Sequence, residues 1–98
     1  MMNPYMQETE NALVHTYNRF PVIFEKGEGV YLYDTEGKKY LDFAAGIAVC
    51  GLGYGNPELT AAVKEQTELL WHTSNLFYNA SCGTAAEALK KASGMDRV

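Results

Sequence analysis

The amino-acid sequence predicts an α+β segment, in which a small antiparallel sheet lies between helices. Between residues 22 and 43, three short runs rich in β-branched and aromatic residues alternate with turn residues. Between residues 57 and 71, apolar residues recur at intervals of three and four, which is typical of an amphipathic helix. The 98 residues are 47% hydrophobic and 20% charged, a composition that excludes intrinsic disorder, collagen and coiled coils.

Residues 7–17 are expected to form a short amphipathic helix near the N-terminus. Leu13, Tyr17 and Phe20 are spaced so that they share one face. We expect the helix to end near Phe20, because Pro21 disfavours the helical conformation in the residue before it.

The next part of the chain is expected to form three antiparallel strands, Val22–Phe24, Val30–Tyr33 and Lys39–Phe43. The connector Gly27–Gly29 permits positive φ values, and the connector Asp34–Gly37 places Asp first and Gly fourth, as a type I turn prefers. A sheet this small is marginal on its own, so we expect a helix or a larger body against one face.

A second helix is predicted from Pro57 to about Trp71, after the glycine-rich connection Ala44–Asn56. Asn56 offers an N-cap oxygen, and Pro57 occupies the first helical position, where its missing N–H needs no partner. One stripe along this helix consists of Leu59, Ala62, Val63, Gln66, Leu69 and Leu70.

A last helix is predicted to begin at Thr84 and to run to about Ala92. Thr84 and Glu87 have the spacing of a capping box, and Ser93-Gly94 supplies the glycine that commonly follows a helix. Before it lies a polar and aromatic loop, residues 72–81. Hydroxyl, amide and aromatic groups gather at residues 72–79, which either bind a ligand or satisfy the loop's own backbone.

The charge pattern excludes two classes of partner. The chain has 12 acidic and 8 basic residues, a net charge of −4, and its basic residues form no stripe, so we expect no nucleic acid and no membrane surface as partner. The longest weakly polar run, Phe43–Gly53, is too short to span a bilayer, and the acidic N-terminus predicts no secretory signal.

The histidines, cysteines and glycines carry no specific site motif. Cys50 and Cys82 lie far apart and outside any CxxC pattern, so reduced thiols in a cytoplasmic protein are expected. No pair formed with His15 or His72 has ligand spacing, so we expect no metal. The glycines of residues 51–55 match no nucleotide-binding fingerprint, and a flexible connection is favoured over a phosphate site.

Six stretches together resemble a known family. They are Tyr17–Val22, Gly27–Phe43, Ala45–Val49, Leu52–Pro57, His72–Tyr78 and Ala92–Val98. They resemble the N-terminal segment of class III aminotransferases, which are pyridoxal 5′-phosphate enzymes of fold type I, and within that family the acetylornithine aminotransferase branch is most similar. The resemblance covers the chain from about Asn11 onward.

The resemblance implies an α/β fold with a mainly parallel central sheet for the whole enzyme. Residues 1–56 would be the N-terminal helix and meander of its small domain. Residues 57–98 would be a helix, an interface loop and a second helix leading into the large cofactor-binding domain. The Schiff-base lysine would lie beyond Val98, so we expect a truncated chain that contains no catalytic residue and is inactive alone.

The resemblance also implies positions for binding residues. Tyr17 would line the substrate pocket, as would Ile47, where ornithine enzymes carry an aromatic residue. That difference leaves room for an acylated substrate. Ser74, Asn75 and Leu76 would form a cofactor-binding or dimer-interface loop of a homodimer.

The sequence is consistent with two functions. The first is part of an aminotransferase that moves an amino group from N-acetylornithine, or a related ω-amino donor, to 2-oxoglutarate in arginine biosynthesis. Succinylornithine, ornithine and 4-aminobutyrate remain open as donors. The second is a non-catalytic binding or regulatory module that reuses the segment.

Overall fold

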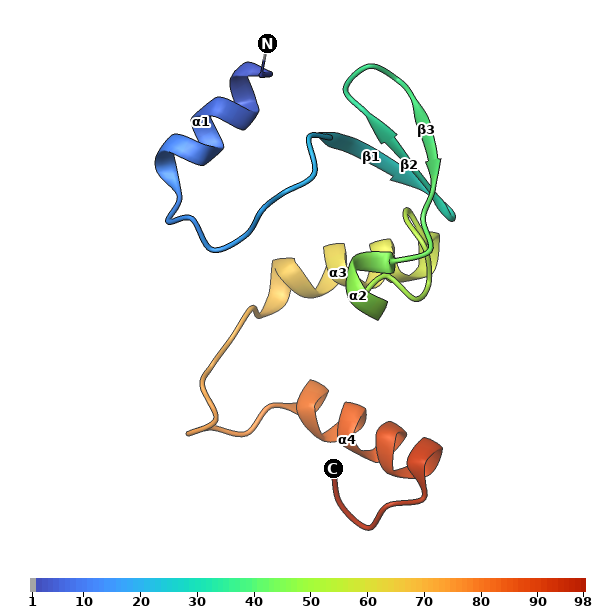
Figure 1. Ribbon diagram of the computed structural model, residues 1–98. Coiled ribbons are helices and arrows are strands. Elements are labelled where there is room, and N and C mark those ends of the chain that lie inside the picture. The colour runs from blue at the N-terminus through green and yellow to red at the C-terminus, as the bar shows by residue number, and fades with distance from the viewer. Residues whose placement is uncertain (1) are drawn as a thin grey trace. The chain divides into compact units, whose positions relative to one another are not determined.

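The computed structural model describes residues 2–98 (Figure 1). The chain forms two compact units, the first extending to Thr60 and the second comprising Ala61–Val98. The elements are α1 (Pro4–Ala12), β1 (Phe24–Glu28), β2 (Tyr31–Asp34), β3 (Lys39–Leu41), α2 (Ala45–Ala48), α3 (Pro57–Leu69) and α4 (Ala80–Ser93). The α+β content expected for this segment is therefore confirmed.

Helix α1 begins and ends earlier than the predicted range 7–17. Asn3 accepts a hydrogen bond from the Tyr5 N–H at 2.9 Å, and proline follows at the start of the helix. Leu13 is extended, with φ −100° and ψ 145°. The expected apolar face, which included Tyr17 and Phe20, is exposed, so it gains no packing energy that would extend the helix.

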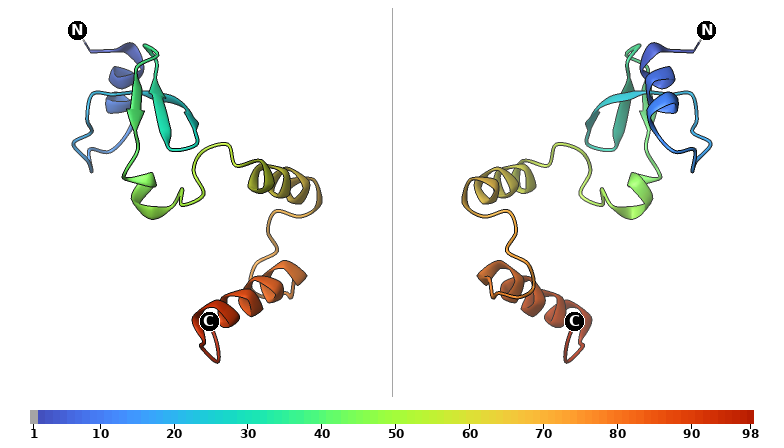
Figure 2. Two further views of the ribbon diagram at one scale, coloured as in Figure 1. Left: turned by 90° about the vertical axis from the view of Figure 1, so that its right-hand side faces the viewer. Right: turned by 90° about the vertical axis from the view of Figure 1, so that its left-hand side faces the viewer.

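The three strands form an antiparallel meander in the order β1-β2-β3, as predicted (Figure 2). Strand β1 lies later in the chain than predicted: it starts at Phe24 and includes Gly27 and Glu28, for which the sequence predicts a connector. Gly29, with φ +58°, makes the turn into β2. Pairing of Gly27 with Leu32 and of Tyr31 with Leu41 fixes the register.

The turn between β2 and β3 is held by the Asp34 side chain. One carboxylate oxygen, Oδ1, accepts hydrogen bonds from the N–H groups of Glu36 and Lys38 at 3.0 and 2.9 Å. The other, Oδ2, accepts from the Tyr40 hydroxyl at 2.9 Å. Gly37 completes the turn with φ +80°, so the predicted Asp-first, Gly-fourth turn is confirmed. Asp34 is 7% exposed and is the one buried side chain in the part of the chain that the structure describes.

Helix α3 matches its predicted start and ends at Leu69 rather than near Trp71. Asn56 Oδ1 accepts from the Leu59 N–H at 3.0 Å, which confirms the predicted N-cap. At the C-terminal end, Gln66 Nε2 donates to the Leu70 carbonyl at 2.9 Å. This side-chain contact satisfies one of the carbonyls that the end of the helix leaves open.

The predicted start of the last helix at Thr84 is wrong. Helix α4 begins at Ala80, and Asn79 Oδ1 caps it by accepting from the Cys82 N–H at 2.8 Å. Thr84 lies inside the helix and donates its hydroxyl to the Ala80 carbonyl, while Glu87 pairs with Lys90. The predicted C-terminal end is confirmed by Gly94, with φ 72°.

Apolar side chains cover the surface of both units. Across residues 2–98, no hydrophobic side chain is buried, and elements pack against one another only within the sheet. Phe43 is 92% exposed, and the apolar stripe of α3 is exposed as well. No helix within this range has both the length and the apolar character needed to cross a bilayer. Exposed apolar area of this extent is typical of surfaces that pack against another part of a protein or against a partner.

Candidate functional site

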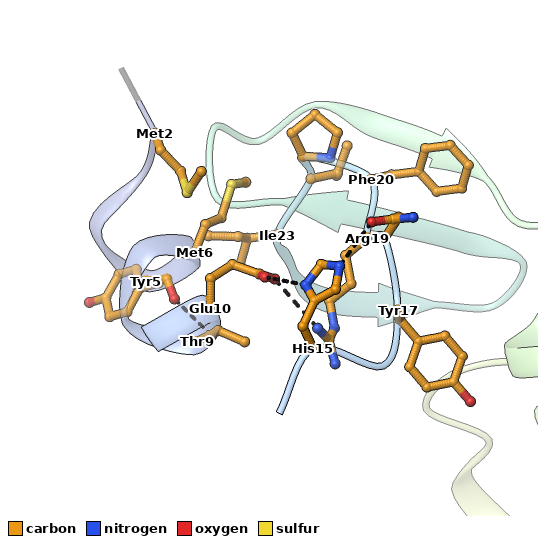
Figure 3. Close-up of a pocket in the computed structure, with 13 residues that line it drawn as sticks. Met2, Tyr5, Met6, Thr9, Glu10, His15, Tyr17, Arg19, Phe20 and Ile23 are labelled. Carbon is orange, nitrogen blue, oxygen red and sulfur yellow. Dashed lines mark hydrogen bonds and ion pairs between the residues drawn. The ribbon is translucent and has the colours of Figure 1, made fainter. Parts of the chain in front are cut away.

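A cavity of about 470 Å³ lies in the first unit, between α1 and residues 15–23 (Figure 3). In Figure 3, Met6 and Glu10 of α1 point toward His15 and Ile23. Tyr17 also lines this cavity, so the structure places one of the two expected substrate-binding residues at a hollow. Ile47 is not among its lining residues.

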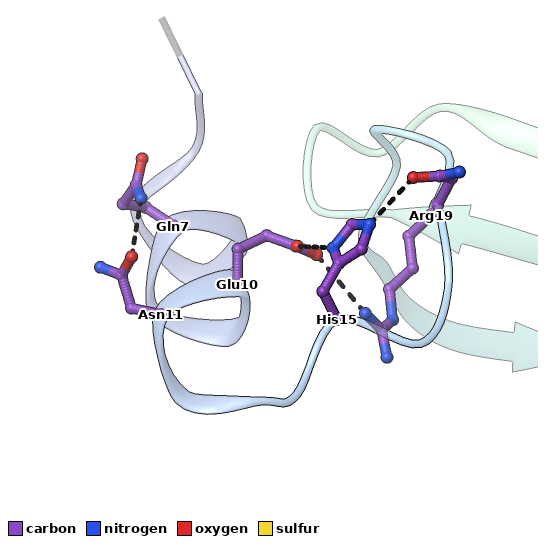
Figure 4. A network of polar contacts seen from close by, with 6 residues as sticks. Gln7, Glu10, Asn11, His15 and Arg19 are labelled. Atoms are coloured by element: carbon purple, nitrogen blue, oxygen red, sulfur yellow. Dashed lines mark hydrogen bonds and ion pairs between the residues drawn. The ribbon is translucent and has the colours of Figure 1, made fainter.

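A polar cluster joins α1 to the segment that carries Tyr17 (Figure 4). Glu10 lies 3.5 Å from His15 Nδ1 and accepts from Arg19 Nη1 at 3.4 Å. His15 Nε2 lies 3.1 Å from Asn18 Oδ1. Each contact is exposed and stabilises by no more than about 1 kcal/mol, so the cluster contributes little to holding the fold together.

The Tyr17 side chain is exposed to solvent rather than buried. Its side chain is 70% exposed, and the Arg19 guanidinium lies 5.9 Å from the ring centroid. A cation at that distance over a ring is weakly attracted to it. The phenol can therefore form a wall and a hydrogen-bonding group for a ligand in this unit.

Ile47 lies on a left-handed turn, α2, that the sequence did not predict. Four consecutive residues have positive φ values, Ala45 (49°), Gly46 (64°), Ile47 (63°) and Ala48 (62°). Left-handed backbone costs about 1–2 kcal/mol for each residue other than glycine, and it is least expected for a β-branched one. Ile47 is nevertheless 92% exposed, so no local packing of its side chain compensates for the strain. Strain of this kind clusters at ligand sites.

Asp42 and Tyr54 hold this turn, and sequence reasoning missed both. Asp42 Oδ1 accepts from the N–H groups of Ala44 and Ala45 at 2.9 and 3.0 Å, and Oδ2 accepts from the Tyr54 hydroxyl. The Tyr54 hydrogen bond, followed by that from Ala45, lowers the pKa of Asp42 below its usual value. The same bond to Asp42, with burial, raises the pKa of Tyr54 to about 12. A signal was present in the spacing, since aspartate before small residues favours side-chain capping of a turn.

Ser74 and Asn75 lie in the second unit, at a smaller cavity of about 170 Å³. Ser74 has φ 64°, and its Oγ accepts from the Leu76 N–H at 3.3 Å. Thr73 Oγ1 is buried and has no hydrogen-bond partner within residues 2–98. The loop thus satisfies part of its own backbone, as one of the two alternatives for residues 72–79 predicts, and ligand binding by these residues stays a prediction.

The smaller cavity offers hydrogen-bonding groups for a ligand and no lysine for an imine with a cofactor. The cavity at Ser74 is lined by hydroxyl, amide, imidazole and apolar groups and by no lysine or arginine. The lysines are exposed except Lys90, which is half-buried and paired with Glu87 at 3.0 Å. An imine-forming lysine needs desolvation or a neighbouring cation that lowers its pKa. No cluster of three metal-ligating side chains occurs within residues 2–98.

Comparison with known proteins places the segment in a family. Residues 12–98 match the aminotransferase class-III family. The acetylornithine aminotransferase of Gloeobacter violaceus is 52% identical over 92 residues, which are 94% of this chain and 23% of that protein. The corresponding enzyme of Aquifex aeolicus is 58% identical over 67 residues, 68% of this chain and 18% of that protein. The chain thus spans less than a quarter of the length of these relatives.

Solved structures agree with this placement. Acetylornithine aminotransferase from Elizabethkingia anophelis has a TM-score of 0.86 and 33% identity, covering 95% of this chain and 24% of that one. Plasmodium falciparum ornithine δ-aminotransferase has a TM-score of 0.87 and 29% identity over the same shares. The fold expected from the resemblance, an N-terminal segment of an α/β aminotransferase, is therefore confirmed. The chain belongs to the class-III aminotransferase family.

Proposed function

We propose that this chain is the N-terminal part of a pyridoxal-phosphate-dependent aminotransferase that moves an amino group from N-acetylornithine to 2-oxoglutarate. The observation that carries the proposal is the 52% identity to an acetylornithine aminotransferase across 94% of the chain. Related ω-amino donors, namely succinylornithine, ornithine and 4-aminobutyrate, are the competing substrates. We place the enzyme in arginine biosynthesis, as a cytoplasmic homodimer.

The chain's own part in this reaction is binding and orientation. Pyridoxal phosphate, when bound, supplies the electron sink for a carbanion at the amino-bearing carbon. Tyr17 offers an exposed phenol and Ile47 an exposed aliphatic wall, and we assign both to the amino donor. We assign Ser74, Asn75 and Leu76 to the dimer interface or to the cofactor site. The covalent lysine is assigned to residues outside this chain.

An aliphatic residue at position 47 favours an acylated donor. The exposed side chain of Ile47 projects from a turn whose backbone is fixed by several hydrogen bonds, so it forms a wall of defined position. An aliphatic wall accommodates a neutral acyl group without leaving a buried charge unpaired. The free α-ammonium group that ornithine carries in place of the acylated nitrogen would lose hydration against the same wall with nothing to replace it.

A chimera tests the proposal on a complete enzyme. In this protein, called the chimera below, the matching 92 residues of the Gloeobacter violaceus enzyme are replaced by those of this chain. We expect it to form glutamate from 2-oxoglutarate with N-acetylornithine as the preferred donor among the four. A preference for ornithine or 4-aminobutyrate would contradict the assignment of the donor.

Ile47→Tyr tests the wall directly. Because an aromatic ring fills the space assigned to the acyl group, we expect kcat/KM of the chimera for N-acetylornithine to fall about tenfold or more. Leu52→Tyr is the matched control, since Leu52 is an exposed aliphatic residue of the same connection. An equal loss in the two variants would show that position 47 does not face the donor.

The alternative of a self-standing binding or regulatory module is not favoured. Such a module needs a hydrophobic core of its own, and the structure buries no hydrophobic side chain within residues 2–98. The family membership of this chain and its exposed apolar surface both favour a segment that packs into a larger protein.

A further inference from the structure

The first unit contains two aspartate–tyrosine pairs with the same pattern of hydrogen bonds. In each, Oδ1 of the aspartate accepts two backbone N–H groups a few residues later, and Oδ2 accepts a tyrosine hydroxyl. Asp34 with Tyr40 closes the ordinary turn between β2 and β3. Asp42 with Tyr54 closes the left-handed turn α2. The first pair stabilises the β2–β3 turn and the second stabilises the turn α2. The first pair can therefore serve as a control for the second.

Tyr54 is anchored to the β1–β2 hairpin independently of Asp42. Its backbone exchanges two hydrogen bonds with Gly29, from the Gly29 N–H at 2.9 Å and to the Gly29 carbonyl at 2.8 Å. Its ring lies over Gly27, where a Cβ would stand 2.3 Å from the ring. The hydroxyl therefore reaches Asp42 from a fixed point on the sheet, and the hydrogen bond ties the turn to the sheet.

The orientation of the turn α2 relative to the sheet depends on the hydrogen bond between Tyr54 and Asp42. Within the turn, Ile47 N–H donates to the Ala44 carbonyl at 2.8 Å and Val49 N–H donates to the Ala45 carbonyl at 2.8 Å. These bonds close the turn on itself and do not orient it against the sheet. Asp42 supplies that orientation, since its carboxylate contacts both the first N–H groups of the turn and the anchored Tyr54.

We infer that Asp42 and Tyr54 are positioning residues for the amino donor: they hold the left-handed turn Ala45–Ala48 and thereby set where Ile47 meets the acyl end of the substrate. The inference rests on the proposed function, which assigns Ile47 to the donor. It adds that selectivity for the acylated donor depends on a hydrogen bond between two residues that do not touch it.

The test is the ratio of kcat/KM for N-acetylornithine to kcat/KM for ornithine, measured on the chimera. A loss of stability alone lowers activity on both donors together and leaves this ratio unchanged. Tyr54→Phe, which removes the hydroxyl, is expected to lower the ratio about tenfold, because a small displacement of a positioning group is costly. Tyr40→Phe, which removes the hydroxyl of the matched pair, is expected to leave the ratio as it was.

Two variants of Asp42 distinguish the hydrogen bonds made by its side chain from the effect of its negative charge. Asp42→Asn keeps an oxygen for the N–H groups of Ala44 and Ala45 and an amide that can donate to Tyr54, so the ratio should stay near that of the parent chimera. Asp42→Ala keeps neither and should lower the ratio as Tyr54→Phe does. Equal ratios in all four variants would overturn the inference.

Crystal structures of the parent chimera and its Tyr54→Phe variant give a readout that does not depend on activity. We expect the φ value of Ile47 to leave the positive region, or the turn to shift relative to β1, in Tyr54→Phe. An unchanged turn would overturn the inference even in an inactive chimera. An inactive chimera whose turn shifts as expected would contradict the proposed function and leave the positioning role supported.

Discussion

At the scale of single residues, Gly27 and Tyr54 pack directly against each other. A side chain on Gly27 would overlap the Tyr54 ring, with its Cβ 2.3 Å from the ring. Gly27 is therefore required by packing and not by backbone conformation, in contrast to Gly29 and Gly37, whose φ values are positive. The hydroxyl of the same ring donates a hydrogen bond to Asp42.

Gly27→Ala is expected to destabilise the first unit by about 1–3 kcal/mol, because the new methyl group must displace the Tyr54 ring. A lower melting temperature of the chimera would show this. Gly51→Ala is the matched control, since a Cβ on Gly51 meets nothing within 4 Å and its φ is not positive. Equal melting temperatures for the two variants would contradict the packing account.

The Asp42–Tyr54 bond also predicts a pH dependence. The lowered pKa of Asp42 means that the bond stabilises the fold above the usual carboxyl pKa of 3.8 and that this contribution is lost as the pH falls through the lower, folded value. The pKa of Tyr54 is raised from 10.0 to about 12, so its contribution is complete below pH 10 and is lost between pH 10 and about 12.

Melting temperatures of the chimera and of its Tyr54→Phe variant across pH 9 to 12 test this window. We expect the difference between the two proteins to be constant up to pH 10 and to shrink above it. A difference that stays constant to pH 12 would mean that the hydroxyl forms no bond to the carboxylate.

At the scale of elements, local side-chain caps decide where the helices begin. Asn3, Asn56 and Asn79 cap α1, α3 and α4 by accepting backbone N–H groups. The sequence predicted only the cap at Asn56, where proline and a clear apolar stripe follow. At α4 it favoured the Thr84–Glu87 spacing, although Asn79, five residues before Thr84, is at least as good a cap.

Asn79→Ala is expected to destabilise α4 by about 1 kcal/mol, because it removes the acceptor of the Cys82 N–H. Circular dichroism of a peptide spanning residues 77–98 would show the loss as lower helix content. Thr84→Ala is the control and should leave helix content equal or higher, because Thr84 lies inside the helix and alanine is the better helix former. A larger loss in Thr84→Ala would restore the original capping-box interpretation.

The sheet and α3 were predictable because their signals are local. Alternating turn residues and β-branched runs predicted the meander, and Asp34 with Gly37 predicted its second turn. The turn α2 was not predicted. Aspartate before small residues indicates a capped turn, but the positive φ values of Ala45, Ile47 and Ala48 occur together with a contact from Asp42 to the distant Tyr54, which no local pattern indicates. Tyr17 and Ile47 entered as candidates through family resemblance, and the structure adds that they lie on different features of the first unit.

At the scale of the whole molecule, exposed apolar surface dominates. No hydrophobic side chain is buried within residues 2–98, and Trp71 and Tyr78 are among the exposed aromatic residues. Folding of a domain depends mainly on burying such area. We therefore expect the isolated chain to show no cooperative heat denaturation, to bind a hydrophobic dye such as ANS, and to form no glutamate from N-acetylornithine.

The chimera provides the contrast in that experiment, because there the same residues have the rest of an aminotransferase to pack against. It should melt cooperatively and bind less dye per chain than the isolated segment. Cooperative melting of the isolated chain without dye binding would instead support a self-standing module.

The central claim is that this chain supplies the N-terminal part of an acetylornithine aminotransferase, and the kcat/KM of the chimera for N-acetylornithine tests it most directly. Because the segment is 52% identical to the one it replaces, we expect a value within about tenfold of the unmodified Gloeobacter violaceus enzyme. A chimera that folds and binds pyridoxal phosphate but transfers no amino group from N-acetylornithine would contradict the claim.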